Sequence, residues 1–248
     1  MHAIVMAAGE GTRLRPLTER WPKAVLPIDG KPVIATLLRE LASAGVEVAI
    51  VVTGHLAEQV ERLVEDGDPY GLSVRYARQP GALGSADAVA RALSAGAEPP
   101  CIVAAADTVF RSGDIRRFWD DFAARELVGA IAVRRDPPPS PGKPAVRIRP
   151  DGLIERVVDD DPGNPLGSAP LWAIAPAFVP YLDDLPGPPY ELAVAAQRAV
   201  DDGAAIAAVE IGSTRDLTRP LDVVDRNFPY LRPLAAPRRA RSDGGREG

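Results

Sequence analysis

Apolar and polar positions follow a regular pattern along the first half of the chain. Continuous apolar runs of strand length predict buried strands, and one alternating stretch, at residues 72–77, predicts a further strand. Apolar side chains at helical spacing predict the helices that cover them. The predicted strands span residues 3–8, 46–53, 72–77, 101–106 and 127–133. The predicted helices between them span residues 33–44, 56–64, 85–95 and 115–122. Four successive strand–helix units indicate parallel strands with helices on both faces of one sheet.

Residues at the ends of two predicted helices support these boundaries. Pro32 suits the start of the first helix, and Gly45 suits its end. Ser85 is expected to be the N-cap of the third helix, and Gly96 is expected to end that helix.

The pattern changes after Asp136. Residues 136–144 are rich in proline and are expected to form a loop. The alternating stretches 145–149 and 153–158 flank a Pro-Asp-Gly turn, which predicts a β-hairpin. Further strands are predicted at residues 171–175 and 204–211, and further helices at 191–200 and 221–231.

These elements predict an α/β fold with a Rossmann-like, doubly wound sheet that is mixed but mostly parallel. A length of 248 residues falls within the range of one α/β domain. We expect a single domain over residues 1–232, with a first half at 1–135 and a second half at 136–232. Residues 233–248 have no apolar pattern and are expected to be a disordered tail.

Composition narrows the classes of function. The formal net charge of −5 argues against a broad surface for nucleic acid. The single cysteine, Cys101, excludes an internal disulfide and a multi-cysteine metal cluster. Two histidines, His2 and His55, leave little room for a histidine metal site or a Ser-His-Asp triad. Because no apolar stretch is long enough for a bilayer and no signal segment opens the chain, we expect a soluble cytoplasmic protein without a membrane partner.

A glycine turn with nearby cations follows the first predicted strand. Gly9 and Gly11 precede Arg13 and Arg15, and Lys23 stands next to a proline. Backbone N–H groups in such a turn can cradle phosphate, while arginine and lysine supply positive charge. The dinucleotide fingerprint fails because position 14 is a leucine, and the Gly-Lys-Ser/Thr end of a P-loop is absent. A tight turn with surface arginines remains the alternative.

The stretch AGEGTRLRPLT at residues 8–18, followed by Pro-Lys at 22–23 and by Pro27, resembles the signature of the sugar-1-phosphate nucleotidylyltransferases. That family includes the glucose-1-phosphate thymidylyl- and uridylyltransferases. The resemblance implies a nucleotide-diphospho-sugar transferase fold, with a nucleotide-binding first half and a sugar-binding second half. It also implies transfer of a nucleoside monophosphate from an NTP to a sugar 1-phosphate, with release of pyrophosphate.

The resemblance implies roles for individual residues. Arg13 and Lys23 would be catalytic, because the reaction brings two anions together and depends on positioning and charge neutralisation. Asp107, which here follows three alanines, and Asp216 would hold Mg²⁺, whose preference for hard oxygen ligands suits carboxylates. The residues expected to bind the nucleotide are Ala8, Gly9, Gly11, Thr12, Arg13, Gln79 and Gly84.

Two of these positions bear on the choice of base. The carboxamide of Gln79 offers a donor and an acceptor, which match O4 and N3–H of uracil or thymine. Gly84 would let the base approach the backbone closely. UTP and dTTP are therefore the favoured nucleotides, and no residue in the sequence decides between them.

The segment after the predicted hairpin departs from the family pattern. The family usually has Glu-Lys-Pro there, whereas this chain has Asp160-Asp161-Pro162. In that register Asp160 stands for the glutamate, and Asp161 puts an anion beside a substrate phosphate, a repulsion of roughly a few kcal/mol in a partly buried site. Lys143 is the expected compensating cation, although a solvated loop lysine is the alternative. Asp160 and Lys143 are thus the expected acceptor-binding residues.

Three functions remain open from the sequence. The favoured one is an enzyme that makes a nucleotide sugar from an NTP and a sugar 1-phosphate. The others are a nucleotidylyltransferase for a non-sugar phosphate and a non-catalytic protein that binds nucleotide sugars. Nucleic acid and membranes are not expected partners, and a homo-oligomer remains possible.

Overall fold

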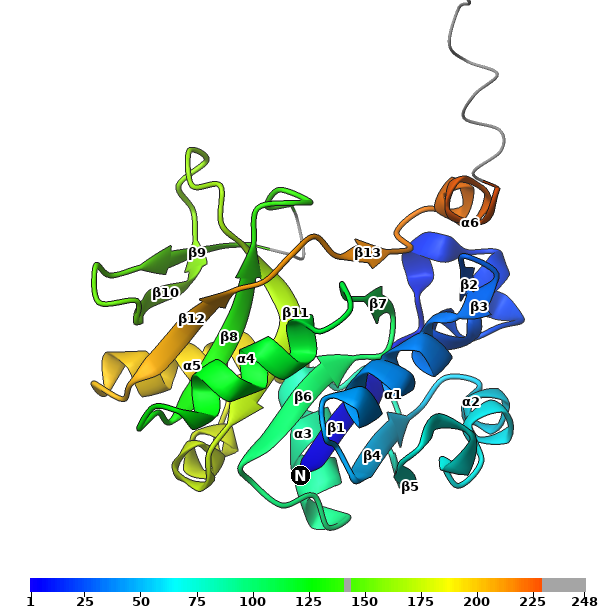
Figure 1. Cartoon of the computed structure of the whole chain (residues 1–248), viewed down its shortest axis with the longest axis horizontal. Helices are drawn as coiled ribbons and strands as arrows, with labels where there is room; N and C mark the ends of the chain where they lie inside the picture. The colour runs from blue at the N-terminus through cyan, green and yellow to red at the C-terminus, as the bar shows by residue number, and fades with distance from the viewer. Residues whose placement is uncertain (141–143, 229–248) are drawn as a thin grey trace, which may run out of the picture.

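The computed structural model describes residues 1–140 and 144–228. A nine-stranded sheet forms the centre of this part of the chain (Figure 1). Seven of its strands follow the order β10, β9, β11, β6, β1, β4, β5. The parallel core of the sheet consists of β1 (His2–Ala7), β4 (Val48–Thr53), β5 (Ser73–Arg78) and β6 (Cys101–Ala105). The first four predicted strands are therefore confirmed. β1, β4 and β6 have neighbours on both sides and their apolar runs are buried, whereas β5 is an edge strand whose buried and exposed positions alternate.

The fifth predicted strand is confirmed, but it is not a neighbour of the fourth. β11 (Gly167–Ile174) lies between β6 and β8 (Gly129–Arg134) and is antiparallel to both. β12 (Ile206–Glu210) then pairs with β8 in parallel. A single antiparallel strand thus joins two parallel groups, which confirms the expected mixed but mostly parallel sheet.

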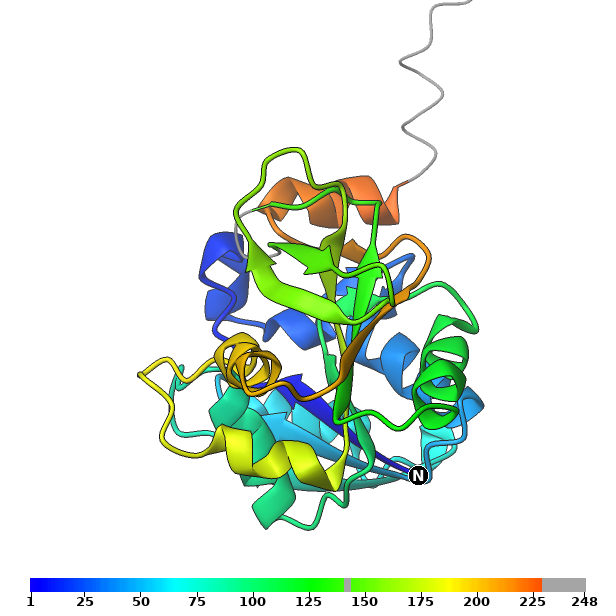
Figure 2. The same ribbon diagram turned by 90° about the vertical axis from the view of Figure 1, so that its left-hand side faces the viewer.

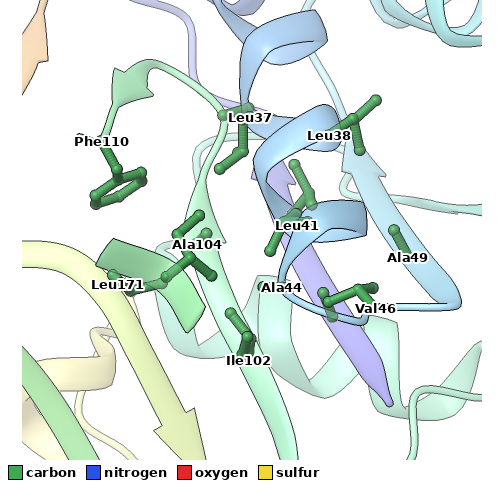
Figure 3. Packing of buried hydrophobic residues seen from close by; sticks show 14 of the residues in the cluster. Leu37, Leu38, Leu41, Ala44, Val46, Ala49, Ile102, Ala104, Phe110 and Leu171 are labelled. Carbon is green, nitrogen blue, oxygen red and sulfur yellow. The ribbon is translucent and has the colours of Figure 1, made fainter. Parts of the chain in front are cut away.

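Helices cover both faces of the sheet, as predicted (Figures 1 and 2). One face carries α1 (Val33–Ser43), α2 (Ala57–Val64) and α4 (Asp114–Ala123), and the other carries α3 (Ser85–Ser94) and α5 (Leu192–Asp201). Figure 3 shows Leu37 and Leu41 of α1 packed near Ile102 and Ala104 of β6. A second set of buried apolar side chains lies under α3 and α5, and burial on both faces stabilises the sheet.

The predicted β-hairpin is confirmed as β9 (Ala145–Ile148) paired antiparallel with β10 (Ile154–Asp159). The structure adds short elements that the pattern did not predict. These are β2 (Pro27–Ile28), β3 (Lys31–Pro32), β7 (Thr108–Val109), β13 (Arg215–Asp216), and the 3₁₀ helices η4 (Asp68–Tyr70) and η5 (Pro176–Leu182).

The ends of two helices differ from the sequence prediction or extend beyond the described residues. Ser85 is not the N-cap of α3, because Gly84 takes that position. The Ser85 hydroxyl instead accepts a hydrogen bond of 2.8 Å from the backbone N–H of Leu192, the first residue of α5. The last helix of the described part of the chain is α6 (Pro220–Asn227), and the predicted end of this helix and the predicted tail lie outside the described residues. Within the described chain, no helix has the length and apolar character needed to span a bilayer.

Candidate active site

One glycine shapes the loop after β1. The chain passes through three short 3₁₀ turns rather than an α-helix: η1 (Thr12–Leu14), η2 (Leu17–Glu19) and η3 (Lys23–Val25). Gly11 has a φ of +64°, and a Cβ at this position would stand 2.9 Å from Cγ2 of Thr18. The Thr18 hydroxyl donates a hydrogen bond of 2.9 Å to the carbonyl oxygen of Gly11. The turn therefore requires glycine at position 11, and it folds the loop back towards Lys23.

Lys23 reaches across to the end of β6. Its ammonium group forms an ion pair with Oδ2 of Asp107. The Thr108 hydroxyl lies 3.2 Å from Oδ1 of the same carboxylate and donates to it. The side chains of Lys23 and Asp107 are 14% and 32% exposed, so the pair is largely sheltered but reachable from solvent. Both residues lie at the carboxyl edge of the parallel strands, where open α/β sheets bind ligands.

A short antiparallel ladder brings Asp216 to the same place. β13 pairs with β7, and Asp216 lies opposite Thr108. Because Thr108 directly follows Asp107, this ladder places the two aspartates close together, which sequence spacing alone could not reveal. The Thr218 hydroxyl donates a hydrogen bond of 3.3 Å to Oδ2 of Asp216. Asp107 and Asp216 line one cavity.

The two carboxylates suit a hard cation. Mg²⁺ is usually held by one or two carboxylates together with substrate phosphates. Among the residues that the structure describes, there is no group of three or more His, Cys, Asp or Glu side chains that could hold a metal ion. The donor set of Asp107 and Asp216 thus matches a Mg²⁺ ion shared with phosphates better than an ion held by the protein alone.

Two adjoining cavities share the cationic residues. One, of about 260 Å³, is formed largely by the loop after β1 and the end of β6. The other, of about 280 Å³, extends towards β11 and the start of α5. Arg13, Lys23 and Asp107 line both. In residues 1–140 and 144–228 no acidic side chain pairs with Arg13, whereas Arg15 pairs with Glu10 at 3.3 Å, so Arg13 is available to an anionic ligand.

A further cavity, of about 480 Å³, lies beside the ends of β1, β4 and β5. Ala8 and Gln79, which the sequence predicts to contact the nucleotide, both line this cavity. Gly84 is not among its lining residues. A Cβ at position 84 would stand 2.2 Å from the carbonyl oxygen of Tyr190, so glycine is needed there for the close approach of this backbone. Contact between Gly84 and a base stays a prediction.

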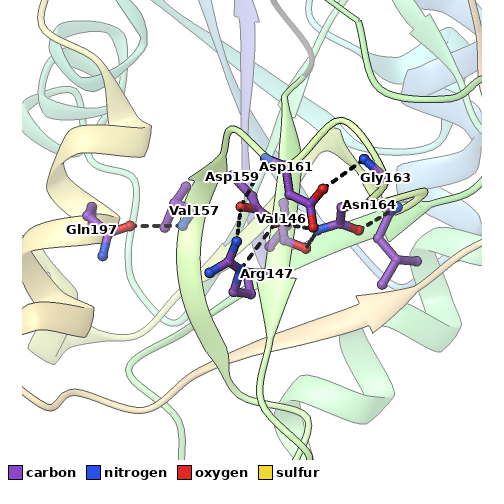
Figure 4. A network of polar contacts seen from close by, with 9 residues as sticks. Val146, Arg147, Val157, Asp159, Asp161, Gly163, Asn164 and Gln197 are labelled. Carbon is purple, nitrogen blue, oxygen red and sulfur yellow. Dashed lines mark hydrogen bonds and ion pairs between the residues drawn. The ribbon is translucent and has the colours of Figure 1, made fainter.

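The expected acceptor segment is part of a polar network (Figure 4). The Asp159 carboxylate accepts hydrogen bonds of 2.8 Å from Arg147 and 2.7 Å from the Asn164 amide. Asp161 accepts a hydrogen bond of 2.8 Å from the backbone N–H of Gly163. Asp160 is exposed and is not among the residues that line the cavity next to Lys23. Lys143 lies outside the described residues, so acceptor contacts of Asp160 and Lys143 stay predictions.

Sequence reasoning missed several residues around the site. Trp172 and Glu191 line the cavity next to Lys23, and the Ser85 hydroxyl donates to Glu191 at 2.7 Å. Their only sequence signal was position, because Trp172 lies in a predicted strand and Glu191 begins a predicted helix. Arg134, at the end of β8, is fully buried. Burial lowers the pKa of Arg134, while the negative charges of Asp216 and of nearby Asp136 act in the opposite direction.

The fold and the site combine an α/β sheet with a glycine turn and cationic side chains that line a cavity at its carboxyl edge. A family model described as nucleotidyl transferase matches residues 2–147. The chain therefore belongs to the nucleotidyl transferase family, which confirms the resemblance to the sugar-1-phosphate nucleotidylyltransferases.

Individual relatives agree with this assignment. The low-salt glycan biosynthesis nucleotidyltransferase Agl11 of Haloferax volcanii is 26% identical over 234 residues, which are 92% of this chain and 65% of that protein. A glucose-1-phosphate thymidylyltransferase of Streptomyces antibioticus is 28% identical over 243 residues, or 94% of this chain and 67% of that protein. The chain thus spans about two thirds of the length of these relatives.

A solved structure supports the fold. The UDP-glucose pyrophosphorylase from Acinetobacter baumanii matches with a TM-score of 0.74 at 21% identity, and the match covers 92% of each chain. The expected nucleotide-diphospho-sugar transferase fold is therefore confirmed.

Proposed function

We propose that this protein is a sugar-1-phosphate nucleotidylyltransferase, which transfers a nucleoside monophosphate from an NTP to a sugar 1-phosphate and releases pyrophosphate. The observation that carries the proposal is a single cavity lined by Arg13, Lys23, Asp107 and Asp216. This reaction brings two anions together, so it needs positioning and charge neutralisation rather than a covalent nucleophile. Membership of the family supports the same reaction.

The residues of the loop have distinct proposed roles. The guanidinium of Arg13 can bridge phosphate oxygens in a fixed fork, and so would neutralise the triphosphate and the departing pyrophosphate. The backbone N–H groups of Gly11 and Thr12 would contact the same phosphates. Lys23 would hold the α-phosphate or the attacking phosphate. These contacts would align the attacking oxygen with the phosphorus that it approaches.

The ion pair between Lys23 and Asp107 shapes how a substrate would enter. The ammonium group has three donors, so a phosphate would bind Lys23 beside the Asp107 carboxylate. The carboxylates of Asp107 and Asp216 would then hold a cation next to that phosphate. Mg²⁺, when bound there, would supply further neutralisation of the phosphate charge.

We propose UTP or dTTP as the nucleotide, because Gln79 lines the cavity that also contains Ala8 of the signature loop. Lys143 and Asp160 remain proposed contacts of the acceptor. The names of the relatives include uridylyl-, thymidylyl- and guanylyltransferases, so the proposed choice of base depends on Gln79 alone.

The test is a panel of NTPs against hexose 1-phosphates and non-sugar phosphates with Mg²⁺, read as pyrophosphate release. We expect the highest kcat/KM with UTP or dTTP and a hexose 1-phosphate, and loss of at least tenfold in Lys23→Ala. Asp120→Asn, which changes an exposed side chain of α4 that lines none of these cavities, is the matched control. Turnover only with a non-sugar phosphate would move the enzyme to that acceptor class. Nucleotide binding without any pyrophosphate release would contradict the proposed reaction.

A further inference from the structure

Gln79 is held by two acceptors. Its side chain is almost fully buried, with the residue 5% exposed. Its Nε2 donates hydrogen bonds of 2.9 Å to the carbonyl oxygen of Gly84 and 2.8 Å to Oδ2 of Asp87. A primary amide has two N–H donors. Both donors of Gln79 are therefore used inside the protein.

These contacts determine which way the amide faces. A rotation by 180° would place Oε1 against the carbonyl oxygen of Gly84 and the carboxylate of Asp87. Both groups are acceptors, so the rotated amide would lose two hydrogen bonds and meet two oxygen atoms. Among the described residues, none donates a hydrogen bond to Oε1 of Gln79 in the observed orientation. The carbonyl is thus the part of this amide that remains for a ligand in the cavity that Gln79 lines.

Asp87 is itself held in place. Arg91, one turn further along α3, donates from Nε to Oδ2 of Asp87 at 2.6 Å and from Nη1 to the carbonyl oxygen of Arg78 at 3.2 Å. Burial acts to raise the pKa of Asp87, but the hydrogen bonds from Arg91 and Gln79 outweigh it and lower the pKa below its usual value. Asp87 is therefore an ionised acceptor at neutral pH and cannot donate to Gln79.

We propose that Asp87 is a positioning residue that holds Gln79 with its carbonyl towards the base, so that the site selects bases with a ring N–H facing that carbonyl. Uracil and thymine carry such a donor at N3, whereas N3 of cytosine is an acceptor and would face the carbonyl oxygen. Guanine also offers an N–H, so this device separates uracil and thymine from cytosine, not from guanine. The inference rests on the proposed nucleotide function and deepens it.

The test replaces a side chain that can only accept by one that can accept or donate. In Asp87→Asn, the new amide can still accept from Gln79, but it can also donate to Oε1 of Gln79, so the preference for one orientation weakens. We expect the ratio of UTP to CTP affinity, measured as Kd by calorimetry, to fall at least fivefold. Arg91→Gln loosens Asp87 without replacing it, and should lower the ratio by a smaller factor.

Two controls separate positioning from a structural role. In a Gln79→Ala background, Asp87→Asn should leave the UTP to CTP ratio unchanged, because the orientation of Gln79 no longer exists. Asp120→Asn should leave the ratio at the wild-type value. Thermal melting of each variant shows whether it is folded, and Arg91→Gln tests the proposal if Asp87→Asn is not.

The outcomes are distinguishable from failure of the proposed reaction. If the wild type binds UTP more tightly than CTP but releases no pyrophosphate, the proposed reaction is wrong and the positioning role of Asp87 still holds. Equal weakening of UTP and CTP in folded Asp87→Asn would overturn the positioning role, as would a wild type without preference for UTP over CTP.

Discussion

The two halves of the molecule supply the site in different ways. In the first half, the loop after β1, Gln79 after β5 and Asp107 after β6 all leave the same edge of parallel strands. In the second half, Asp216 arrives on the two-residue strand β13, which is held by pairing with β7. Parallel strands bring their carboxyl ends together through topology alone, whereas a short ladder depends on the long connection that leads to it.

The difference extends to the polar contacts. In the first half, Lys23 and Asp107 are paired at the cavity that we assign to substrate. In the second half, the Asp159 carboxylate accepts hydrogen bonds from Arg147 and Asn164 at the base of the hairpin. The Asp159 carboxylate thus makes its contacts within the fold, while Lys23 and Asp107 line the cavity that we assign to substrate. The variants below separate these two uses, in order of decreasing expected effect.

The contact between the halves at Gly84 should be the most sensitive to substitution. Gly84→Ala would put a Cβ 2.2 Å from the carbonyl oxygen and 2.6 Å from the nitrogen of Tyr190, at a φ of +96°. Backbone strain adds about 1–2 kcal/mol and forced repacking about 1–3 kcal/mol, so we expect a loss of roughly 3 kcal/mol in unfolding free energy. Denaturant titration measures this loss. Gly203→Ala, with a φ of +84° and open space around the position, is the control for strain alone. Equal losses in the two variants would show that the contact with Tyr190 is not required.

Asp107→Asn and Asp216→Asn test whether the halves contribute equally to the proposed metal site. We expect each variant to lower turnover at least tenfold, which corresponds to about 1.4 kcal/mol or more of activation free energy. Pyrophosphate release over a range of Mg²⁺ concentrations is the measurement, and both variants should need more Mg²⁺ than the wild type. A wild-type rate in Asp216→Asn alone would mean that the second half supplies no metal ligand.

Asp159→Ala tests whether the ionised Asp159 carboxylate stabilises the folded protein. The hydrogen bond from Asn164 lowers the pKa of Asp159, burial opposes this, and the ion pair with Arg147 lowers it further. Because the folded pKa is depressed, the stability is present above the unfolded pKa of about 3.9 and is lost as the pH falls through the folded value. We expect the variant to lose about 1–2 kcal/mol at pH 7, since Arg147 is half exposed.

Denaturant titrations of wild type and Asp159→Ala at several pH values check this expectation. The difference between them should shrink below about pH 4. The KM for the NTP should stay unchanged, because Asp159 lies outside the cavities that we assign to the nucleotide. A constant difference over the whole pH range would contradict the role of the ionised carboxylate.

The sequence predicted the strands, helices and signature loop because their signals are local. Apolar runs predicted β1 and β6, and the glycine turn with its cations singled out Arg13 and Lys23, which line one cavity in the structure. Contacts between residues far apart in the sequence could not be predicted. Ser85 was expected to cap its own helix and instead binds the start of α5, 107 positions away. The carboxamide of Gln79 was expected to offer a donor, but Asp87 and Gly84 use it. Such pairings depend on which segments meet after folding.

Asp160 should show the smallest effect, and it tests the register used to assign the acceptor residues. The family pattern places it at the glutamate that precedes the lysine. In the structure it is exposed, does not line the cavity next to Lys23, and follows Asp159, whose side chain faces Arg147 and Asn164 instead. We therefore expect Asp160→Ala to change the KM for the sugar phosphate by less than about twofold, since exposed charges are well screened. Steady-state kinetics with the acceptor varied at saturating NTP measures this, with Glu191→Gln as the comparison because Glu191 does line that cavity. A tenfold rise in the KM for the sugar phosphate in Asp160→Ala, with the KM for NTP unchanged, would support Asp160 as an acceptor contact. The acceptor would then bind beside the β9–β10 hairpin and not in the cavity near α5.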